Sequence, residues 1–544
     1  MTKQKSTKSN KRAKNHWRDK AIYQIYPRSF HARENKDGNG DLIGIIEKLD
    51  YLQELGIDVI YMSPVYPSPM KDNGYDVEDY LDINPMFGDK QTLNRLITSA
   101  HKRNMLIMMD FVPNHTSDQH EWFKQARSSK NNPKRNWYLW HSGKRDGSKP
   151  NNWINVFDNT PGSAWTWDEK TKEYYLHSFL KEQPDLNWDN PEVVAEMHNI
   201  LLCWMDRGID AFRIDSGLYV IKHPKYPDEP LNPDYVAGIS HPNEIYTHTA
   251  SKDQLRGFKK LVDMGDLVGS RGGFVMQEVY IGAEERVALY RLSEYGLSIP
   301  LNFDLIFSTS WNARDIKKAI FDYYALLKNE DIVPLPLGNH DQSRVASRLG
   351  SQENARLAAM LQMTLDCVPV IFQGEEIGME DVTIPQEKQQ DPFVQKLRDP
   401  ARTPMQWDDS PNAGFTQSGA NPWLPVAPNY KQRNVKKQLE DPKSMLTLYK
   451  KLLAFRKEQL VPGRPVAVDV DNDNVLAYVR TTKTGKRVII LLNFSKNPET
   501  VDTKSLHITP GKVLLITSLD IESDTAVDFN SFVLKPKVGY IYLI

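Results

Sequence analysis

The sequence predicts an α/β fold: a (β/α)8 barrel with a domain inserted after its third strand and an antiparallel β-sandwich at its C-terminus. Short apolar runs alternate with amphipathic helical segments between residues 20 and 465, which is typical of parallel strands joined by helices. A stretch rich in Trp, Asn, Lys, Gly and Pro, over 111–188, interrupts the alternation. From about residue 466 the pattern changes to that of hairpins. A single barrel with one insertion accommodates a chain of 544 residues.

These changes of pattern divide the chain into four parts. Residues 1–19 form a basic tail that we expect to be disordered. Residues 20–110 and 189–465 form the predicted barrel, 111–188 the inserted domain, and 466–544 the C-terminal β-sandwich.

Seven apolar runs are candidates for barrel strands: 21–27, 58–66, 104–112, 210–217, 273–280, 333–341 and 368–376. Apolar residues recur on one helical face over 45–55, and Gly56 is a stop signal. Asp89 is an expected N-cap for the next helix. Asn190 followed by Pro191 marks the start of the helix after the interruption.

Composition and charge exclude several classes of function. The chain has 69 basic and 70 acidic side chains and a formal net charge of −1, whereas a nucleic-acid-binding protein shows a basic excess. No apolar run reaches the length of a membrane span, about 18 residues. The basic N-terminus lacks the apolar stretch of a secretory signal, so we expect a cytoplasmic protein. No pattern in the sequence indicates an oligomeric state.

Polar residues follow the predicted strands at the positions where barrel enzymes carry their active sites. Asp215, Glu278 and Asp341 end three different strands and are expected to converge on one cleft. Convergent carboxylates are used to bind a divalent metal or to cleave glycosidic bonds. Metal hydrolases usually add several His or closely spaced Asp ligands, and here only His115 and His340 lie near the site. The pattern therefore favours a glycosidase over a metal hydrolase.

Four short segments carry a family resemblance. DFVPNH (110–115), DAFRIDS (210–216), MQEVY (276–280) and GNHDQSR (338–344) resemble the four sequence regions of the α-amylase superfamily, glycoside hydrolase family 13. Further segments are similar to its oligo-1,6-glucosidase and α-glucosidase branch: NGYDVEDY (73–80), QPDLNW (183–188) and RTPMQWDDSPNAGF (402–415). The resemblance implies the same barrel, inserted domain and C-terminal sandwich.

The resemblance also implies roles for the three carboxylates. Asp215 would be the nucleophile that forms a covalent glycosyl-enzyme, and Glu278 the general acid and then base of a retaining mechanism. Asp341 would hold the 2- and 3-hydroxyls of the sugar. Arg213 lies two residues before Asp215 on a strand, so both side chains point to one face, and its charge would keep the nucleophile ionised.

The same resemblance implies a pocket that is closed at one end. His115 and His340 would contact the bound glucose, and Tyr75 would stack on it. Asp76 would bind the 4- and 6-hydroxyls while paired with Arg402. This wall implies an exo-acting α-glucosidase, with a small-molecule carbohydrate as its partner, rather than an endo-acting amylase. A structural ion pair at the barrel rim is the alternative.

The preferred linkage is predicted less directly. In this branch Val after the nucleophile accompanies α-1,6 activity, and here Ser216 takes that position. We therefore favour α-1,4 bonds, with an oligo-1,6-glucosidase as one alternative. A sucrose isomerase or transglucosidase on the same scaffold is another. A non-enzymatic binding scaffold like the transporter heavy chains is disfavoured, because all three carboxylates are present and a membrane helix is absent.

The chemistry requires no cofactor, but one loop has the spacing of a calcium site. Asn35, Asp37, Asn39 and Asp41 alternate with other residues, as oxygen ligands around one ion do. The family pattern places Asp where this chain has Arg33, and a neighbouring cation disfavours Ca²⁺. A structural Ca²⁺ and an ordinary Gly/Asn turn are the two alternatives.

Overall fold

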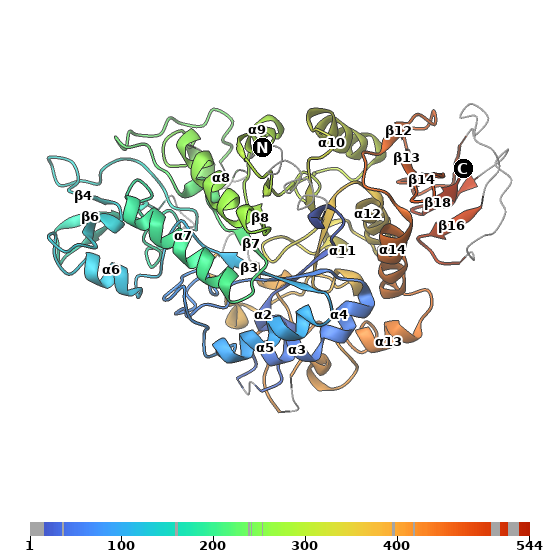
Figure 1. Cartoon of the computed structure of the whole chain (residues 1–544), viewed down its shortest axis with the longest axis horizontal. Coiled ribbons are helices and arrows are strands. Elements are labelled where there is room, and N and C mark those ends of the chain that lie inside the picture. Colours follow the sequence, from blue (N-terminus) through green and yellow to red (C-terminus); the bar gives the residue numbers. More distant parts are fainter. Residues whose placement is uncertain are drawn as a thin grey trace, which may run out of the picture.

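The computed structural model describes residues 16–34, 37–157, 162–237, 240, 242–252, 254–393, 398–416, 419–501, 512–520 and 533–544. Its centre is a sheet of eight parallel strands in the order β10-β11-β1-β2-β3-β7-β8-β9 (Figure 1). The strands are β1 Ile22–Ile25, β2 Val59–Met62, β3 Leu106–Phe111, β7 Ala211–Ile214, β8 Phe274–Gln277, β9 Ser298–Pro300, β10 Pro334–Pro336 and β11 Val368–Phe372. The prediction of a (β/α)8 barrel is confirmed.

The two edge strands of the sheet are β9 and β10. The segment that follows β9 pairs with β10 and so closes the barrel. The backbone N–H of Asn302 donates to the carbonyl of Pro334 at 3.0 Å. Sequence patterning identified seven of the eight strands and missed β9. That strand has three residues and ends in Pro300, so it presents no apolar run long enough to be recognised.

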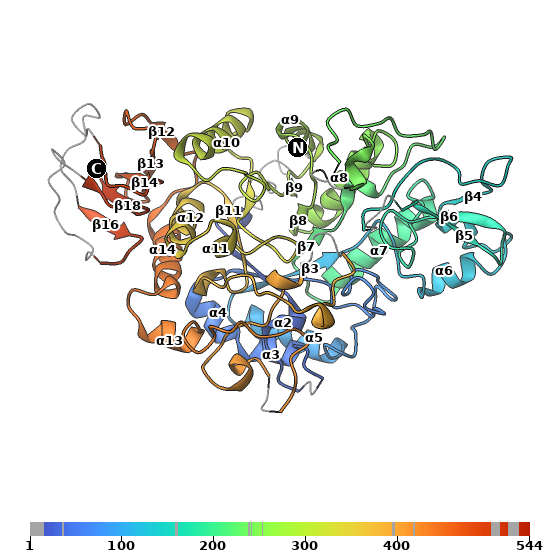
Figure 2. The ribbon, with the colours of Figure 1, turned by 180° about the vertical axis from the view of Figure 1, so that it is seen from behind.

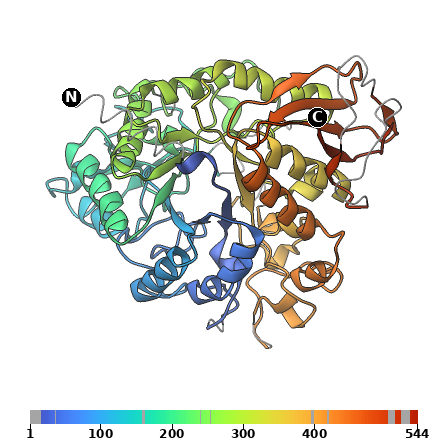
Figure 3. The ribbon, with the colours of Figure 1, turned by 45° about the vertical axis from the view of Figure 1, so that its right-hand side comes forward.

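Helices surround the barrel, and their sequences explain several of their ends (Figure 3). Asp89 accepts from the N–H of Thr92 and caps α5, and Asn190 caps α7, as predicted. Gly56 ends α4 in the left-handed conformation, at φ 99°. The helix predicted over 45–55 is two helices, α3 and α4, separated at Lys48, whose ψ of 6° is not helical.

The helices of the described chain have the following bounds: α2 Pro27–Phe30, α3 Leu42–Glu47, α4 Leu49–Leu55, α5 Lys90–His101, α6 Glu121–Ala126, α7 Pro191–Asp206, α8 Leu255–Ser270, α9 Ala283–Leu292, α10 Ala313–Leu326, α11 Val345–Arg348, α12 Gln352–Thr364, α13 Val435–Glu440 and α14 Met445–Gln459. In the described part of the chain, none of them is long and apolar enough to cross a membrane.

Two antiparallel units lie at opposite ends of the molecule (Figure 2). After β3 the chain forms a small sheet from β4 Trp140–His141, β6 Glu173–Leu176 and β5 Trp165–Asp168. At the C-terminus, five strands pair in the order β12 Val466–Val468, β13 Val475–Thr481, β14 Arg487–Asn493, β18 Gly539–Leu543 and β16 Val513–Ile516. A second pair consists of β15 Glu499–Thr500 and β17 Val533–Leu534.

The C-terminal sheet buries both of its faces. Leu476 and Leu492 belong to the main core of the barrel, whereas Ala477 and Leu491, one residue along each strand, belong to a separate apolar cluster. This alternation follows from the two-residue repeat of a strand. The sheet therefore attaches to the barrel through one face and carries its own small core on the other.

Candidate active site

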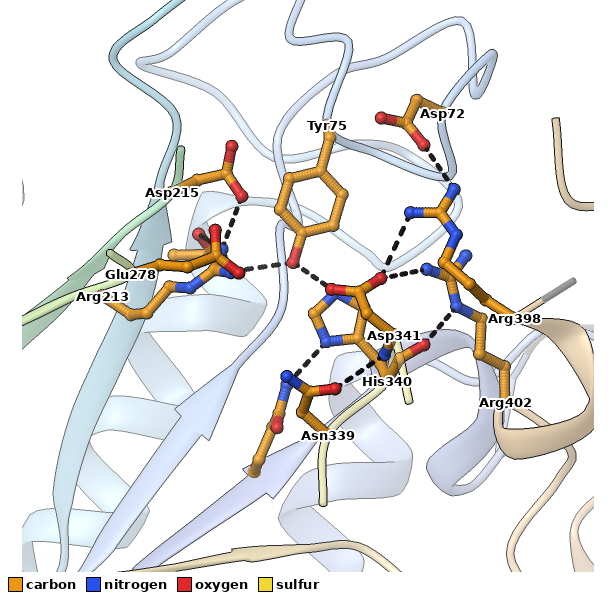
Figure 4. Close-up of polar contacts among 12 residues, drawn as sticks. Asp72, Tyr75, Arg213, Asp215, Glu278, Asn339, His340, Asp341, Arg398 and Arg402 are labelled. Atoms are coloured by element: carbon orange, nitrogen blue, oxygen red, sulfur yellow. Dashed lines mark hydrogen bonds and ion pairs between the residues drawn. The ribbon is translucent and has the colours of Figure 1, made fainter. Parts of the chain in front are cut away.

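The carboxylates predicted from three strand ends do converge, and a single guanidinium joins two of them (Figure 4). Arg213, on β7, is almost fully buried, and its Nη1 lies 2.7 Å from Oδ1 of Asp215. Its Nη2 lies 2.6 Å from Oε1 of Glu278, which follows β8. Asp110, on β3, accepts from the same Nη1 at 2.9 and 3.0 Å. Parallel strands deliver these groups to one edge because their carboxyl ends meet there.

Three acidic side chains contact the single guanidinium of Arg213, so acidic groups outnumber basic ones in this cluster. Burial raises the pKa of Asp215 well above its usual value, and the carboxylates of Glu278 and Asp110 raise it further, whereas Arg213 lowers it. Burial likewise raises the pKa of Asp110, against the effect of Arg213. Asp110 and Asp215 therefore each hold a proton to a higher pH than a solvent-exposed carboxyl group would, and Arg213 is the cation that opposes this shift.

Two further donors fix the carboxylate of Glu278. The backbone N–H of Ser216 donates to Oε2 at 3.0 Å, and the hydroxyl of Tyr280 donates to Oε1 at 2.9 Å. Ser216 has a φ of 48°, in the left-handed region that residues other than Gly rarely adopt. This local strain places its N–H toward Glu278, so the position after Asp215 also orients the second carboxylate.

Tyr75, which lines the cavity, stacks on the buried His340 behind it. Their rings are parallel within 2° with centroids 5.5 Å apart, and the Tyr75 hydroxyl lies 2.8 Å from Nε2 of His340. The other ring nitrogen, Nδ1, lies 2.9 Å from the side-chain amide of Gln24 on β1. Burial lowers the pKa of His340 to about 3, so the ring is neutral at physiological pH.

His115 links β3 to the segment that returns from the inserted sheet. Its Nε2 lies 3.0 Å from the amide nitrogen of Gln183, which also donates to Oδ2 of Asp72 at 3.1 Å. Burial lowers the pKa of His115 to about 4. His115, His340 and Tyr75 therefore lie beside the carboxylates as predicted, His115 and His340 as neutral imidazoles.

Asp341 accepts from two guanidiniums. Nη2 of Arg402 lies 2.8 Å and Nη1 of Arg398 lies 3.2 Å from its Oδ1. Burial alone would raise the pKa of Asp341, but the guanidiniums of Arg398 and Arg402 lower it well below its usual value. Asp341 is therefore anionic across the physiological pH range, with about a fifth of its side chain exposed.

The predicted pair of Asp76 and Arg402 is wrong. Asp76 is fully buried, and its oxygens accept from the hydroxyl of Ser68 and the backbone N–H groups of Lys71 and Asp72. These contacts hold the turn that precedes Tyr75, and they direct Asp76 away from the pocket. Arg402 instead donates to the carbonyl of His340 at 2.7 Å as well as to Asp341.

Asp72 and Arg398 form an ion pair at the cavity like the one predicted for Asp76 and Arg402. Asp72 lines the pocket and accepts from Nη2 of Arg398 at 3.0 Å. The same Nη2 of Arg398 lies 2.6 Å from Oδ1 of Asp391. Burial raises the pKa of Asp72 to about 6, while Arg398 lowers it.

A cavity of about 240 Å³ lies above these groups. Its polar floor consists of Asp72, Tyr75, His115, Asp215, Glu278, Asp341 and Arg398, and its upper wall contains Val156, Phe157, Phe179, Leu218, Tyr219 and Phe393. Phe157 packs against Phe179 at 5.6 Å and Phe393 at 5.2 Å between ring centroids. The insertion after β3 supplies Val156, Phe157 and Phe179 of this apolar wall, and the segments after β7 and β11 supply the rest. Apolar walls with a few charged groups are typical of small-molecule sites.

The candidate calcium loop has its oxygens engaged by protein donors. Asn39 accepts from Nε of Arg28 at 2.9 Å, and Asp41 caps α3 and accepts from the N–H groups of Arg33 and Glu34. Asn35 lies outside the described residues. Asn39 therefore already has a cationic partner in Arg28, and the Ca²⁺ site stays a prediction. No cluster of His, Cys, Asp or Glu suited to a metal occurs elsewhere in the described ranges.

The geometry agrees with comparisons to known proteins. The family model for the catalytic domain of α-amylase matches residues 24–463. The chain belongs to the α-amylase family. It is 38% identical to the α-glucosidase of Apis mellifera, over 97% of this chain and 94% of that protein. It is also 38% identical to the oligo-1,6-glucosidase of Parageobacillus thermoglucosidasius, over 97% and 99% of the two chains.

Solved structures of the α-amylase family superpose over almost the whole chain. The α-glucosyl transfer enzyme XgtA matches with a TM-score of 0.87 and 32% identity, covering 97% of this chain and 99% of its own. The trehalulose synthase MutB from Pseudomonas mesoacidophila MX-45 matches with a TM-score of 0.84 and 32% identity, over the same shares. The chain is therefore a glycoside hydrolase family member with full-length relatives.

Sequence reasoning missed Asp72, Arg398 and Tyr280 in this α-amylase family site. Asp72 lies four residues before Asp76, and Arg398 four residues before Arg402, so each motif offers two residues of the same type. Only the backbone of the turn decides which one faces the pocket. Tyr280 lies within the segment MQEVY, two residues after Glu278 and just beyond the end of β8. Alternate residues of an extended chain share a face, so that spacing could have identified it.

Proposed function

We propose that the protein is a retaining, exo-acting α-glucosidase that releases glucose from the non-reducing ends of short α-glucosides. One observation carries the exo assignment: the ion pair between Asp72 and Arg398 lies across one end of the cavity, with Asp341 beside it. Such a wall leaves no path for a further sugar beyond the terminal one. The names of the relatives from Apis mellifera and Parageobacillus thermoglucosidasius support the same activity class.

In the first step, an oxygen of the Asp215 carboxylate attacks the anomeric carbon of the terminal glucose. The bond between that carbon and the glycosidic oxygen breaks, and Glu278 gives its proton to the leaving oxygen. The contact of Arg213 with both carboxylates, at 2.7 and 2.6 Å, supports a small separation between them, as a retaining mechanism requires. Arg213 also stabilises the negative charge of the nucleophile before the attack.

In the second step, water attacks the same carbon and the bond to Asp215 breaks. Glu278, now ionised, takes the proton of the attacking water and returns to its starting state. Besides Arg213, the backbone N–H of Ser216 and the hydroxyl of Tyr280 donate to the Glu278 carboxylate. These donors keep it in one orientation through both steps.

Recognition of the terminal glucose rests on groups that flank this pair. Asp341 is anionic and accepts hydroxyl hydrogens of the ring, which we assign to the 2- and 3-hydroxyls. Asp72 and Arg398 meet the far side of the ring, where the 4- and 6-hydroxyls lie. Charge-assisted bonds of this kind are about twice as strong as neutral ones, and they contribute to rate when they strengthen in the transition state.

We favour α-1,4 bonds because Ser216 replaces the Val that accompanies α-1,6 activity. Transfer of glucose to a sugar acceptor is the second candidate. Tyr280 is about half exposed and its ring stacks on Phe303, 4.9 Å away, with the exposed Phe307 beside it. An aromatic surface next to Glu278 offers a stacking platform for an acceptor, and the transferase names of XgtA and MutB agree with it.

Initial rates on maltose, isomaltose, sucrose and soluble starch, with the products separated, test this proposal. We expect glucose from a disaccharide without any fall in starch viscosity, and a higher kcat/KM on maltose than on isomaltose. A rapid loss of starch viscosity would show that the pocket is open at both ends. Isomers or longer saccharides formed from sucrose or maltose would assign the chain to transfer instead of hydrolysis.

A further inference from the structure

A second cavity, of about 330 Å³, lies at the opposite, amino end of the barrel. It is bounded by residues that precede β1, β2 and β11, by the end of α14, and by β13 with its hairpin. Its charged and ionisable lining residues are His16, Asp19, Lys20, Asp58, Asp366, Arg456, Lys457, Arg480 and Lys483, and Leu460, Val461 and Pro462 complete it. The proposed glucosidase chemistry uses none of them.

Two of the three acidic residues in this lining already have cationic partners. Asp58 lies 2.8 Å from Nζ of Lys457. Asp366 lies 2.6 Å from a guanidinium nitrogen of Arg18 and 3.0 Å from one of Arg464. Asp19 is the remaining carboxylate. The lining holds four further cationic side chains besides the paired Lys457, so the cavity carries an excess of positive charge.

Two of those cations are buried arginines that contact carbonyl groups instead of carboxylates. Arg456 is 9% exposed, and its Nη1 donates to the carbonyls of Leu365 at 2.7 Å and Met363 at 3.1 Å. Arg480 is 3% exposed and donates to the carbonyl of Val461 at 2.8 Å. Within the described chain, neither forms an ion pair, and the buried Nε of Arg456 has no hydrogen-bond acceptor. Asp19 acts electrostatically on Arg456 and Asp366 on Arg480, but no described carboxylate reaches ion-pair distance of either arginine, and a buried charge that is only partly balanced favours binding of an anion.

We propose that this cavity binds a phosphate group, either inorganic phosphate or the monoester of a sugar. Arg456 also donates to the carbonyl of Cys367, Arg480 to that of Thr364 and Lys483 to that of Lys457. A phosphate dianion supplies two negative charges, and its oxygens can accept from the N–H groups of these side chains and of Lys20 that the carbonyls leave over. Leu460, Val461 and Pro462 give the cavity an apolar side next to these cations, against which the carbon face of a sugar can lie.

The location of the cavity determines what binding would do. Arg456 belongs to α14, Lys20 precedes the first barrel strand, and Arg480 and Lys483 belong to the C-terminal sheet and its hairpin. A bound phosphate therefore joins the barrel to the C-terminal sheet. Because a ligand that binds only the folded state stabilises it by mass action, phosphate raises the temperature of unfolding without reaching the catalytic cavity.

Thermal unfolding of the full chain tests this site, with inorganic phosphate, glucose 6-phosphate and sodium chloride compared at one ionic strength. We expect a saturable rise in Tm with either phosphate compound and none with chloride. Lys20→Ala and Lys483→Ala should each weaken the apparent Kd about fivefold, the usual effect of one partly exposed charge. Lys486→Ala, an exposed lysine of the same hairpin outside the cavity, is the matched control and should leave Kd unchanged.

The affinities of the site for glucose 6-phosphate and for inorganic phosphate distinguish the two sources of the phosphate group. Tighter binding of glucose 6-phosphate than of inorganic phosphate assigns the site to a sugar monoester, and equal affinities assign it to free phosphate. The proposal is overturned by an equal rise of Tm in chloride, by a rise that does not saturate, or by unchanged affinity in the Lys20→Ala/Lys483→Ala double variant. Far-UV circular dichroism of the variants without anion confirms that they are folded.

Discussion

Nη2 of Arg398 lies 3.0 Å from Oδ1 of Asp72, although 326 residues separate them in the sequence. Asp72 follows the second barrel strand, and Arg398 follows the eighth. Arg398 also contacts Asp391 and Asp341, so its position is fixed from three sides. Both residues line the cavity, and the specificity for chain ends that we propose depends on this pair.

We predict that Asp72→Asn lowers kcat/KM on maltose about 10- to 100-fold. The amide keeps the size of the carboxylate but loses the charge, and a hydrogen bond to a charged group contributes about 1.5–3 kcal/mol. Arg398 retains Asp391 and Asp341 as partners, so the variant should fold. The measurement is initial rates on maltose together with the Tm of the variant.

Asp76→Asn is the matched control for that experiment. Asp76 accepts three bonds within its own turn and does not line the cavity. Its substitution should lower the free energy of unfolding by about 1–3 kcal/mol with little change in KM. A larger effect on KM from Asp76→Asn than from Asp72→Asn would show that the earlier sequence-based assignment of the wall was right.

We predict that Asp215→Ala and Glu278→Ala both abolish measurable hydrolysis of maltose, and that azide distinguishes their roles. In Glu278→Ala, azide attacks the glucosyl-enzyme formed from 4-nitrophenyl α-glucoside and needs no general base, so the product is the α-glucosyl azide. In Asp215→Ala, azide takes the place of the missing carboxylate and attacks once, so the product is the β-anomer. Both results follow from double and single displacement at the anomeric carbon.

The anomeric form of the azide product, measured by NMR, decides the assignment. If the two variants give the opposite anomers to those expected, Asp215 and Glu278 have exchanged roles. Activity near that of the wild type in either variant would remove that residue from the chemistry. Asp206→Ala, an exposed carboxylate at the end of α7, serves as the control and should retain wild-type rates.

Much of the fold and the catalytic floor could be predicted from local patterns. Apolar runs that end in Asp215, Glu278 and Asp341 identify parallel strands and place their polar ends at one edge of a barrel. The caps at Asp89 and Asn190 were predicted from two or three residues each, because capping depends on local hydrogen bonds. Such features need no knowledge of distant contacts.

The pocket wall could not be predicted in the same way. The turn before Tyr75 directs Asp72, and not Asp76, into the cavity. This choice depends on the hydrogen bonds that Lys71 and Ser68 donate to Asp76. Arg398 and Arg402 are likewise separated by a short helical turn whose direction is set by Asp391 and Asp399. The strand β9 was missed because its pairing with β8, and not its own composition, makes it a strand.

We predict that Lys222→Met lowers the free energy of unfolding by about 3–5 kcal/mol, the usual cost of removing one partner of a buried ion pair. Nζ of Lys222 lies 2.8 Å from Oδ2 of Asp185 and 3.1 Å from the side-chain oxygen of Asn114. These contacts connect the loop after β7 to the insertion after β3. Urea denaturation measures the effect, and Lys225→Met, an exposed neighbour, should change stability by less than about 0.5 kcal/mol.

His120 lies outside the catalytic cavity, and we predict that it makes the folded protein less stable in acid. Burial, with smaller contributions from Lys124 and Lys134, lowers its pKa from 6.5 to about 3. Its Nδ1 accepts from the N–H of Trp122 at 3.1 Å and so caps α6, which requires the neutral ring. Below pH 6.5 the unfolded chain binds a proton here that the folded chain does not, so His120 makes stability fall as pH falls from 6.5 toward 3.

Replacement of His120 by Asn keeps a side chain that can cap a helix but removes the titrating group. The free energy of unfolding of His120→Asn should therefore depend on pH less steeply than that of the wild type, by about 1.4 kcal/mol per pH unit below pH 6. At pH 8 both caps are neutral, so the difference in the free energy of unfolding there reports the change in packing, since the buried His120 ring lies against Trp122. Urea denaturation at pH 8, 6 and 5 measures both quantities, and parallel curves for the two proteins would mean that His120 is protonated in the folded state as readily as in the unfolded chain.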